Sequence, residues 1–380
     1  MRILLKQLST EAIENCITCL NYKFDRVIFF GAQEVIDEEK VNIKHFLFEE
    51  CEKVESEYYA ISNDIEEVER LIVSKIKKEN EHYIDLTGAD GIINVALSNV
   101  AYANNIPMHI FDVKNSEIFS VTKKDIRSIT DLPQRKIELN IEKYIKMLGG
   151  IVVARRQKSN KLNTNNDFID KLISIKHKYN SIWTNFCFAL QQIKPEDSSL
   201  KVCLEDKSEL LKVCKNRISD KEIENILNDY YKCQLIKNYR YGNVISFEYC
   251  NEDVMQDTLE AGAILEEEVY KYELIDSDDC SIGIHLDWDG IVQSQSEGDV
   301  TNEVDVLRLD GYILTFISCK NNKRVDKNAL YELETVTRRF GGKYSSMKLV
   351  YDGNVSLTDK ERARLIGIKV LSLQDLLNQK

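Results

Sequence analysis

Two strand-like segments near the C-terminal end carry the residue types that phosphodiester hydrolysis requires. Residues 302–307 read Asn-Glu-Val-Asp-Val-Leu, residues 312–320 read Tyr-Ile-Leu-Thr-Phe-Ile-Ser-Cys-Lys, and a Leu-Asp-Gly turn lies between them. Asp305 therefore lies in one predicted strand and Lys320 ends the next. Such a carboxylate can hold a divalent cation, while the lysine steers or deprotonates the attacking water and offsets negative charge on the phosphate. The pair predicts a metal-dependent phosphodiesterase centre.

Further oxygen ligands accompany this pair. Glu303 lies two residues before Asp305, so both side chains share one face of a strand. An upstream predicted helix carries Glu266 in a Leu-Glu-Glu-Glu run. Because neighbours on a helix diverge by about 100°, we expect one acid of this run, Glu266, to face the sheet. Hard cations prefer clustered carboxylate and carbonyl oxygens, so the candidate metal ligands are Glu266, Asp305 and the carbonyl of Cys319. The alternative is three unrelated surface clusters.

A second candidate site lies at the ends of the strands predicted near the N-terminus. The most pronounced polar cluster there is Thr-Gly-Ala-Asp-Gly at 87–91, between a strand and a helix. Glycines let a backbone approach a ligand, helix N-terminal amides favour phosphate, and open α/β sheets bind ligands at this edge. The expected binding residues are Ser9, Thr10, Thr87, Gly88, Ala89, Asp90 and Gly91. The alternative is a tight turn in which Thr87 or Asp90 caps the helix.

The elements that must position these residues begin with a domain expected at 1–150. Strands and helices alternate over about its first 120 residues, which predicts a parallel sheet with crossover helices, and the remainder is expected to be a connector. The clearest elements are strands at Arg2–Leu8, Arg26–Phe30, Tyr58–Ile61, Tyr83–Leu86 and Met108–Val113, and helices at Val68–Lys78, Ile92–Ala103 and Asn140–Leu148. Residues 151–250 form a helical connector with a pattern like that of a winged helix. It comprises a polar linker at Arg155–Asn166, helices at Asp167–Gln192 and Asp220–Tyr231, and a hairpin over Gln234–Tyr249.

Residues 251–380 predict a third domain with the core order αβββαβ. The expected elements are a helix at Asp253–Tyr272, strands at Ser281–Trp288, Val304–Leu309 and Tyr312–Ser318, a helix at Lys327–Phe340, a strand at Lys348–Tyr351, a helix at Thr358–Ile366 and a strand at Lys369–Leu373.

Composition narrows the class of protein. The net charge of −12 argues against a general nucleic-acid coat, although a nuclease needs only a local positive groove. No signal peptide and no apolar run of about 18 residues is present, so no membrane partner is expected. Most of the ten cysteines stand singly in apolar stretches, which is typical of a reduced, cytoplasmic protein. The close pair Cys16 and Cys19 has no second pair at zinc-site spacing.

Several motifs together resemble the CRISPR-associated CARF-domain nucleases in which a CARF domain is fused to a PD-(D/E)XK domain. They are Thr-Gly-Ala-Asp-Gly at 87–91, Gly-Ala-Ile-Leu-Glu at 262–266, Asn-Glu-Val-Asp-Val at 302–306, Ile-Ser-Cys-Lys at 317–320 and Arg-Phe-Gly-Gly-Lys at 339–343. The resemblance covers nearly the whole chain. It implies an α/β protein with an N-terminal Rossmann-like CARF domain and a C-terminal restriction-endonuclease-like domain.

The resemblance also implies an activity and partners. The protein is expected to be a homodimeric, Mn²⁺- or Mg²⁺-dependent endonuclease of type III CRISPR antiviral defence. Its allosteric activator is expected to be a ring of four or six adenylates, with cyclic tetra-adenylate preferred. The ring would lie on the two-fold axis, which suits an isologous interface. The substrate is single-stranded DNA, RNA or nicked duplex DNA. Two departures from the family pattern stand out: Ser318 replaces an acid two residues before the lysine, and Ala89 replaces a glycine.

Two other functions remain open on the sequence. One is a ligand-responsive regulatory protein whose nuclease fold is inactive because of Ser318. The other is an ungated repair or restriction-type nuclease whose N-terminal domain only dimerises. Activity with and without the cyclic ligand distinguishes all three.

Overall fold

The computed structural model describes residues 1–122, 126–128, 134–156, 165–194, 199–215, 217–287, 301–321 and 327–379. The chain divides into two compact units, each made of three segments. The first unit comprises Met1–Ala154, Asp276–Ile317 and Leu330–Met347, and the second comprises Arg155–Ile275, Ser318–Ala329 and Lys348–Lys380. The division 1–150, 151–250 and 251–380 stays a prediction.

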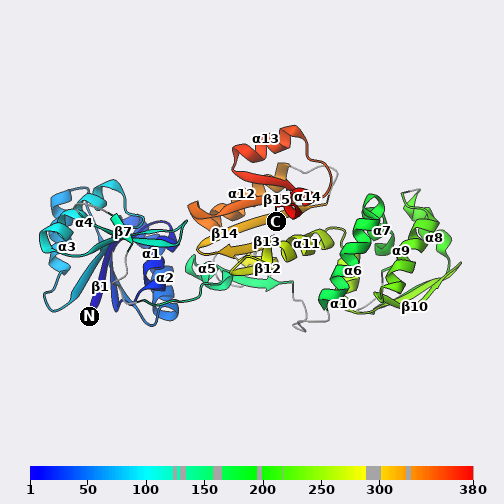
Figure 1. Ribbon diagram of the computed structural model, residues 1–380, viewed down its shortest axis with the longest axis horizontal. Helices are drawn as coiled ribbons and strands as arrows, with labels where there is room; N and C mark the ends of the chain where they lie inside the picture. The colour runs from blue at the N-terminus through cyan, green and yellow to red at the C-terminus, as the bar shows by residue number, and fades with distance from the viewer. Residues whose placement is uncertain are drawn as a thin grey trace. The chain divides into compact units, whose positions relative to one another are not determined.

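The first unit contains a seven-stranded sheet with the order β3-β2-β1-β4-β5-β6-β7 (Figure 1). The strands are β1 (Arg2–Gln7), β2 (Arg26–Gly31), β3 (Glu55–Ala60), β4 (Glu81–Asp85), β5 (Met108–Asp112), β6 (Glu117–Val121) and β7 (Ile126–Ser128). The first five are parallel, whereas β6 and β7 pair antiparallel. The order 3-2-1-4-5 is that of doubly wound sheets, in which ligands bind at the carboxyl edge of the strands.

Helices cover both faces of this sheet. They are α1 (Ala12–Asn21), α2 (Gln33–Glu50), α3 (Ile65–Lys75) and α4 (Gly91–Asn104), and α5 (Ile141–Met147) follows later in the chain. Ile3 and Leu5 of β1 belong to the core under α3 and α4, whereas Lys6 points to the opposite face, where its ammonium contacts α1. The alternation follows from the two-residue period of a strand. The parallel sheet predicted from the sequence is therefore confirmed.

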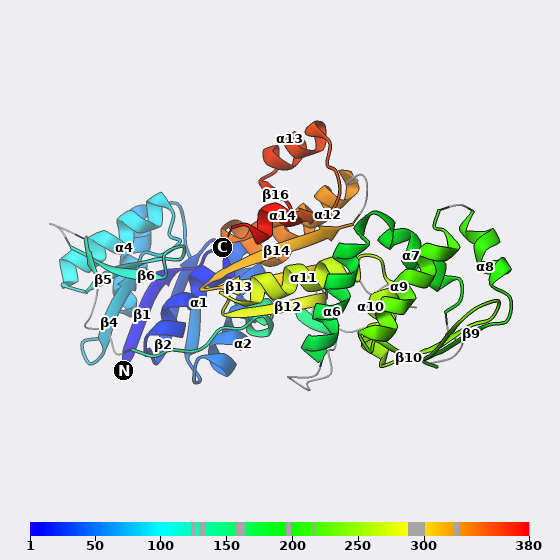
Figure 2. The ribbon, with the colours of Figure 1, turned by 45° about the vertical axis from the view of Figure 1, so that its right-hand side comes forward.

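A second sheet of six strands has the order β16-β15-β14-β13-β12-β8. Its strands are β8 (Ile151–Arg155), β12 (Asp279–Asp287), β13 (Thr301–Asp310), β14 (Ile313–Lys320), β15 (Ser346–Tyr351) and β16 (Ile368–Ser372). Strands β12, β13 and β14 form an antiparallel meander (Figure 2). The accompanying helices are α11 (Ala263–Leu274), α12 (Lys327–Gly341), α13 (Leu357–Leu365) and α14 (Leu373–Leu377). The expected order of helix, three strands, helix and strand is present, and β8 is an additional edge strand.

The middle of the second unit is a group of helices around a small sheet. Its elements are α6 (Asn165–Lys178), η1 (Asn180–Ile182), α7 (Trp183–Gln191), β9 (Lys201–Leu204), α8 (Lys207–Cys214), α9 (Asp220–Lys232), β10 (Ile236–Tyr241), β11 (Ile245–Tyr249) and α10 (Glu252–Leu259). The sheet order is β10-β11-β9, and all pairs are antiparallel. A helix, a strand, two helices and a hairpin that pairs with the first strand have the connectivity of a winged helix. We call the segment from α7 to β11 the winged-helix segment.

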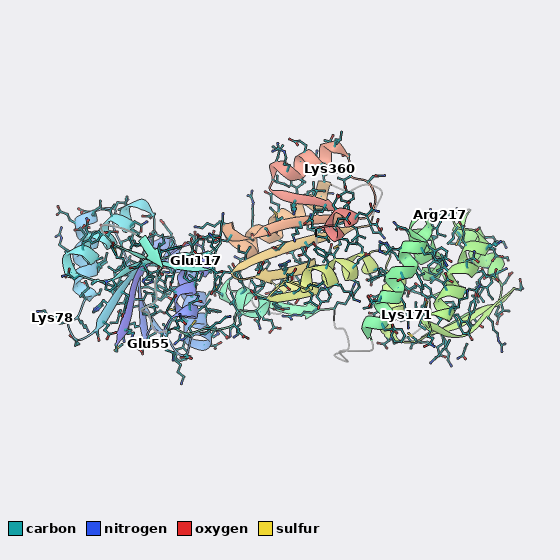
Figure 3. The ribbon with its side chains drawn as sticks, in the orientation of Figure 1. Glu55, Lys78, Glu117, Lys171, Arg217 and Lys360 are labelled. Carbon is teal, nitrogen blue, oxygen red and sulfur yellow. The ribbon has the colours of Figure 1, made fainter. Side chains whose placement is uncertain are left out.

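Local signals define this segment. Ser219 and Glu222 form a capping box at the start of α9, which satisfies the first amides of that helix. Trp183, Phe186 and Tyr230 fill its core. Arg217, just before α9, lies with its guanidinium carbon 4.8 Å from the ring centroid of Phe188 on α7 (Figure 3).

Two predicted helices are interrupted in the structure. The helix expected over Asp167–Gln192 is divided into α6, η1 and α7. The helix expected over Asp253–Tyr272 is divided into α10 and α11, because Glu260 is extended (φ −98°, ψ 107°). Trp288 and most of the predicted linker, residues 157–164, lie outside the described residues. Within the described parts of the chain, no helix has the length and apolarity that crossing a bilayer demands.

Candidate functional site

The turn at 87–91 joins β4 to α4 and is tied to the end of β1. Asp90 caps α4, with its Oδ1 accepting a hydrogen bond from the Ile93 amide at 3.1 Å. The Asp90 amide donates to Oε1 of Gln7 at 2.6 Å, and Gln7 Nε2 donates to Asp90 Oδ2 at 3.2 Å. The polar ends of two neighbouring strands are thus linked at the carboxyl edge of the sheet.

Gly88 brings this turn against α1. Its φ of +72° lies in the left-handed region, and a Cβ at this position would lie 2.2 Å from Oε2 of Glu14. A side chain here would require backbone strain and the displacement of a buried carboxylate. At Gly91, by contrast, a Cβ would meet no described atom within 4 Å. Glycine is therefore required for steric reasons at position 88, and no such steric reason applies at position 91.

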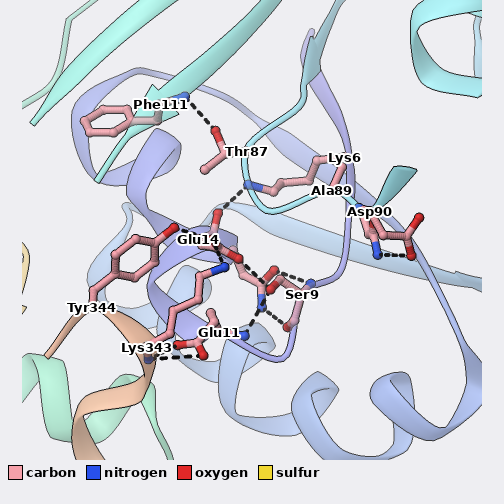
Figure 4. A network of polar contacts seen from close by, with 12 residues as sticks. Lys6, Ser9, Glu11, Glu14, Thr87, Ala89, Asp90, Phe111, Lys343 and Tyr344 are labelled. Carbon is pink, nitrogen blue, oxygen red and sulfur yellow. Dashed lines mark hydrogen bonds and ion pairs between the residues drawn. The ribbon is translucent and has the colours of Figure 1, made fainter. Parts of the chain in front are cut away.

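Glu14 is a buried carboxylate, 1% exposed, that links the turn to the segment after α12. Ser9 Oγ donates to its Oε2 at 2.6 Å, and the Tyr344 hydroxyl donates to its Oε1 at 2.5 Å. Lys343 Nζ lies 2.7 Å from Oε1. Burial opposes ionisation of Glu14, but these hydrogen bonds and the Lys343 charge outweigh it and lower the pKa. The carboxylate is therefore ionised and held from two sides (Figure 4).

A buried lysine–aspartate pair continues this network. Lys6 Nζ donates to Asp85 Oδ2 at 2.7 Å and to the backbone oxygen of Glu14 at 2.5 Å. Thr18 Oγ1 donates to the same Asp85 oxygen at 2.7 Å. Although burial disfavours the charged form of Asp85, the Lys6 charge and the hydrogen bonds from Lys6 and Thr87 lower its pKa to about 2. The floor of the candidate ligand site is therefore charge-balanced.

The seven residues expected to bind the ligand differ in accessibility. The exposed or half-buried ones are Thr10, Gly88, Ala89, Asp90 and Gly91. Ser9 and Thr87 are buried. The hydroxyl of Ser9 donates its hydrogen bond to Glu14, and Thr87 Oγ1 accepts a hydrogen bond from the Phe111 amide at 2.8 Å. Ser9 and Thr87 therefore shape the site from within, and a ligand would first meet the exposed groups.

Sequence reasoning did not identify Lys6, Glu14 or Lys343. One signal was available, because Lys6 interrupts the apolar run Ile3-Leu4-Leu5 and a charged residue in a buried strand demands a partner. Nothing in the sequence connects Glu14 with Lys343. Lys343 entered the sequence analysis only as the end of the motif at 339–343, and the structure shows that it contacts Glu14.

In the first unit, Glu303 and Asp305 lie two residues apart on β13, as predicted. The Glu303 side chain is 54% exposed, and its Oε1 lies 3.9 Å from Nε2 of His285. Asp305 is half-buried and directly precedes Val306, which pairs with Ile317 of β14. The residues that follow Ile317 on that strand are Ser318, Cys319 and Lys320.

In the second unit, the three acids of α11 have different surroundings. Glu267 is completely buried, and Glu268 is nearly so. Oε1 of Glu268 lies 2.7 Å from Nε2 of His177, and its Oε2 lies 4.0 Å from Nζ of the buried Lys176. The Glu266 side chain keeps 16% exposure. Glu266 is therefore the most exposed of the three, and its role as the metal ligand stays a prediction.

One arginine lies close to three acids at and just before the start of α11. Arg156 Nη1 lies 3.3 Å from Oε2 of Glu266 and 4.0 Å from Oδ1 of Asp257. Its Nη2 donates to Oε2 of Glu260 at 3.0 Å. Three carboxylates around one guanidinium make a site that attracts cations.

Lys320 lies at the end of β14, and contacts of its neighbours bring this end to the start of α11. Asn321 Nδ2 donates to the backbone oxygen of Ala261 at 2.6 Å. The backbone oxygen of Lys320 accepts from the Asp352 amide at 3.2 Å, and the Asp352 carboxylate binds Lys176. The end of β14 and the entry to α11 are therefore adjacent.

The donor set fits a hard divalent cation. Glu266, Asp305 and the Cys319 carbonyl offer oxygen only, and the guanidinium beside Glu266 shows that this acid attracts positive charge. Among the residues that the structure describes, no group of three or more His, Cys, Asp or Glu side chains is arranged to hold a metal. That Glu266, Asp305 and the Cys319 carbonyl share one cation stays a prediction.

The fold is similar to that of two solved structures over almost the whole chain. One is protein VC1899 from Vibrio cholerae, with a TM-score of 0.71 and 14% identity over 99% of this chain and 95% of that one. The other is Can2 from Sulfobacillus thermosulfidooxidans in complex with cyclic tetra-adenylate, with a TM-score of 0.68 and 16% identity over 99% of this chain and 94% of that one. At these identities the likeness shows a shared fold. No protein-family model matches the sequence, and no curated protein matches it.

Proposed function

We propose that this protein is a metal-dependent endonuclease of type III CRISPR defence that a cyclic oligoadenylate activates. The observation that carries the proposal is the contact between Asn321 and Ala261, because it brings the strand end that carries Lys320 to the entry of the helix that carries Glu266. The fold shared with Can2, a protein solved with cyclic tetra-adenylate, supports the class of ligand.

In the proposed nuclease site, Glu266, Asp305 and the Cys319 carbonyl hold Mn²⁺ or Mg²⁺. The bound ion would supply Lewis-acid chemistry and a more acidic water. The Lys320 ammonium orients the attacking water and stabilises charge on the phosphate. Glu303, which is exposed two residues before Asp305, supplies the carboxylate that Ser318 lacks.

In the proposed ligand site, the adenylate ring rests on the exposed groups of the turn, namely Thr10, Ala89, Asp90 and Gly91. A homodimer would place two such turns around the two-fold axis of an even-numbered ring. Gly88 lies directly against Glu14, which Lys343 and Tyr344 hold from the opposite side. A ligand that shifts the turn must therefore also shift these two residues, which lead into β15, and binding favours the active state.

The central experiment is a cleavage assay with Mn²⁺ on single-stranded DNA, RNA and nicked duplex, with and without cyclic tetra-adenylate. We expect cleavage only when the ligand is present. No cleavage under any condition would support a regulatory protein with an inactive nuclease fold, and equal cleavage without ligand would support an ungated nuclease.

The Lys343→Met variant tests the gate separately. It removes the cation from Glu14 and leaves the exposed turn intact, so we expect cyclic tetra-adenylate to bind but to stimulate cleavage far less. Lys369→Ala, an exposed lysine on β16, is the control and should respond as the unmodified protein does. If cyclic tetra-adenylate stimulated cleavage by Lys343→Met as fully as cleavage by the unmodified protein, Glu14 and Lys343 would have no part in activation.

A further inference from the structure

The small sheet of the winged-helix segment has two faces of different character. Residues directly opposite in an antiparallel sheet share a face, as do residues two apart along one strand. The register therefore places two rows on one face, namely Arg240, Ser246 and Cys203, and Lys237, Glu248 and Lys201. The opposite face carries Phe247 and Val202, which belong to the core. The first face is polar, and none of these six residues belongs to the core.

A groove of about 570 Å³ lies over this polar face. Its lining includes Lys201, Arg240, Ser246 and the carboxylate Glu248 from the rows described, and Tyr231 and Tyr239 beside them. Tyr231 is 52% exposed, and the centroid of its ring lies 5.6 Å from that of Tyr239. Two neighbouring aromatic rings at the edge of a cationic groove are the combination on which unpaired bases stack while their phosphates meet cations.

The charge of this face contrasts with that of the chain. It carries three cations, Lys201, Lys237 and Arg240, and one carboxylate, Glu248, which forms an ion pair with Lys237 at 2.9 Å. The chain as a whole has a net charge of −12. A positive surface on so acidic a protein is complementary to a polyanion.

The helix that usually enters the major groove in this kind of motif is unsuited to DNA here. Helix α9 carries four carboxylates and two lysines. Asp220 binds Lys207 at 2.6 Å, and Asp229 binds Lys178 at 2.6 Å, so these acids are part of the fold. Arg217, the cation that precedes the helix, packs on Phe188. A negatively charged helix would repel the phosphates of a duplex.

From these observations we infer that the groove between the polar face of the β9–β11 sheet and Tyr231 binds single-stranded nucleic acid. Arg240 and Lys201 bind phosphates, and Tyr231 and Tyr239 stack bases. The inference rests on the proposed function for the kind of substrate and locates a part of substrate binding away from the cleaving residues.

The test measures binding without cleavage. The full chain is titrated into fluorescein-labelled oligodeoxythymidine, oligouridine and a duplex of equal length, in EDTA, and anisotropy is recorded. Arg240→Glu and Lys221→Glu are a matched pair, because each reverses one exposed cation, the first in the groove and the second on α9. We expect Arg240→Glu to weaken single-strand binding at least tenfold and Lys221→Glu to leave it unchanged. Tyr231→Ala should weaken it about tenfold.

A salt titration makes the test quantitative. Loss of one phosphate contact in Arg240→Gln should reduce the slope of log affinity against log salt by about 0.7. The inference would be overturned if Arg240→Glu bound single strands as tightly as the unmodified chain does. It would also be overturned if Lys221→Glu weakened single-strand binding as much as Arg240→Glu, or if Arg240→Glu weakened binding of the duplex equally. The thymidine and uridine arms show whether DNA or RNA is preferred.

The outcomes also separate this inference from the proposed function. If the protein binds single strands through Arg240 but never cleaves them with Mn²⁺ and ligand, the groove stands and the nuclease fails. If the protein cleaves normally and Arg240→Glu changes neither affinity nor KM, the nuclease stands and the groove fails.

Discussion

Glu14 and Glu266 are both carboxylates at the start of a helix, but their surroundings differ. Glu14 is sealed from solvent, and Ser9, Tyr344 and Lys343 contact its oxygens. Glu266 is partly open to solvent and lies beside Arg156, which it shares with other acids. The contacts of Glu14 hold the turn and α1 in place and already balance its charge. The acids around Glu266 attract a further cation. Substitutions in the two regions should therefore affect different properties, namely stability and ligand binding near Glu14 and cleavage near Glu266.

The largest expected effect is at the cleaving residues. Lys320→Ala and Asp305→Ala should each lower cleavage about 100-fold or more, because each removes a group that acts on the phosphate, the water or the metal. Binding of cyclic tetra-adenylate, measured by calorimetry, should be unchanged. Lys369→Ala is the control for loss of a lysine. Turnover near that of the unmodified chain in either variant would remove that residue from the site.

A smaller but substantial effect is expected from a single methyl group at the ligand turn. In Gly88→Ala, the left-handed backbone costs about 1–2 kcal/mol, and the new Cβ collides with Glu14. We expect a lower midpoint of thermal unfolding and weaker binding of cyclic tetra-adenylate. Gly91→Ala, where the Cβ meets no described atom, should leave the midpoint of thermal unfolding unchanged. Equal effects of the two variants would contradict a steric role for Gly88.

The buried pair below Glu14 predicts a pH dependence of stability. The pKa of Asp85 falls from 3.8 to about 2 on folding, so its ionised form stabilises the protein above pH 4 and this contribution is lost as the pH falls toward 2. The difference in unfolding free energy between the unmodified chain and Asp85→Asn should therefore narrow, by on the order of 2 kcal/mol, across this window. Urea unfolding at several pH values measures it, and a constant difference would argue against the shift.

The smallest effect is expected at Arg156. Removing its charge in Arg156→Ala frees the acids around Glu266 for a cation, so the Mn²⁺ concentration for half-maximal cleavage should fall a few-fold. Arg364→Ala, whose arginine pairs with Glu361 on α13, is the control. A different result would be a lower rate of cleavage at saturating Mn²⁺ with an unchanged Mn²⁺ concentration for half-maximal cleavage. Arg156 would then bind the substrate and would not tune the metal site.

The sequence predicted those elements whose pattern is local. The five parallel strands, the hairpin over β10 and β11, and the alternation of β13 and β14 all follow from apolar periodicity and turn residues. Strands β6, β7, β8 and β9 were missed, and β8 and β9 are short strands whose partners are distant in the chain. The break between α10 and α11 was missed because Glu260 and Ala261 are compatible with a helix, and the extended conformation of Glu260 appears only in the folded chain.

The candidate sites divide in the same way. The positions of Asp305 on β13 and Lys320 at the end of β14 were predictable, because strand patterns fix them. The contacts of Glu14 with Lys343 and of Glu266 with Arg156 were not, because each joins residues that only tertiary folding brings together. Whether the cleaving and ligand-binding residues act as proposed stays a prediction.

The position of β8 has a consequence for the order of events during translation. This strand leaves the ribosome before the entire winged-helix segment, yet its neighbour β12 is synthesised after that segment. Domains generally fold as they emerge from the ribosome, so the N-terminal sheet can form early. Strand β8 can pair only after β12 has been synthesised. Lys320 and the strands beyond it are made later still. A ribosome that stalls or a message that is cut short would therefore release a chain that has the turn of the proposed ligand site but lacks Lys320 of the proposed nuclease site and Lys343, which contacts Glu14.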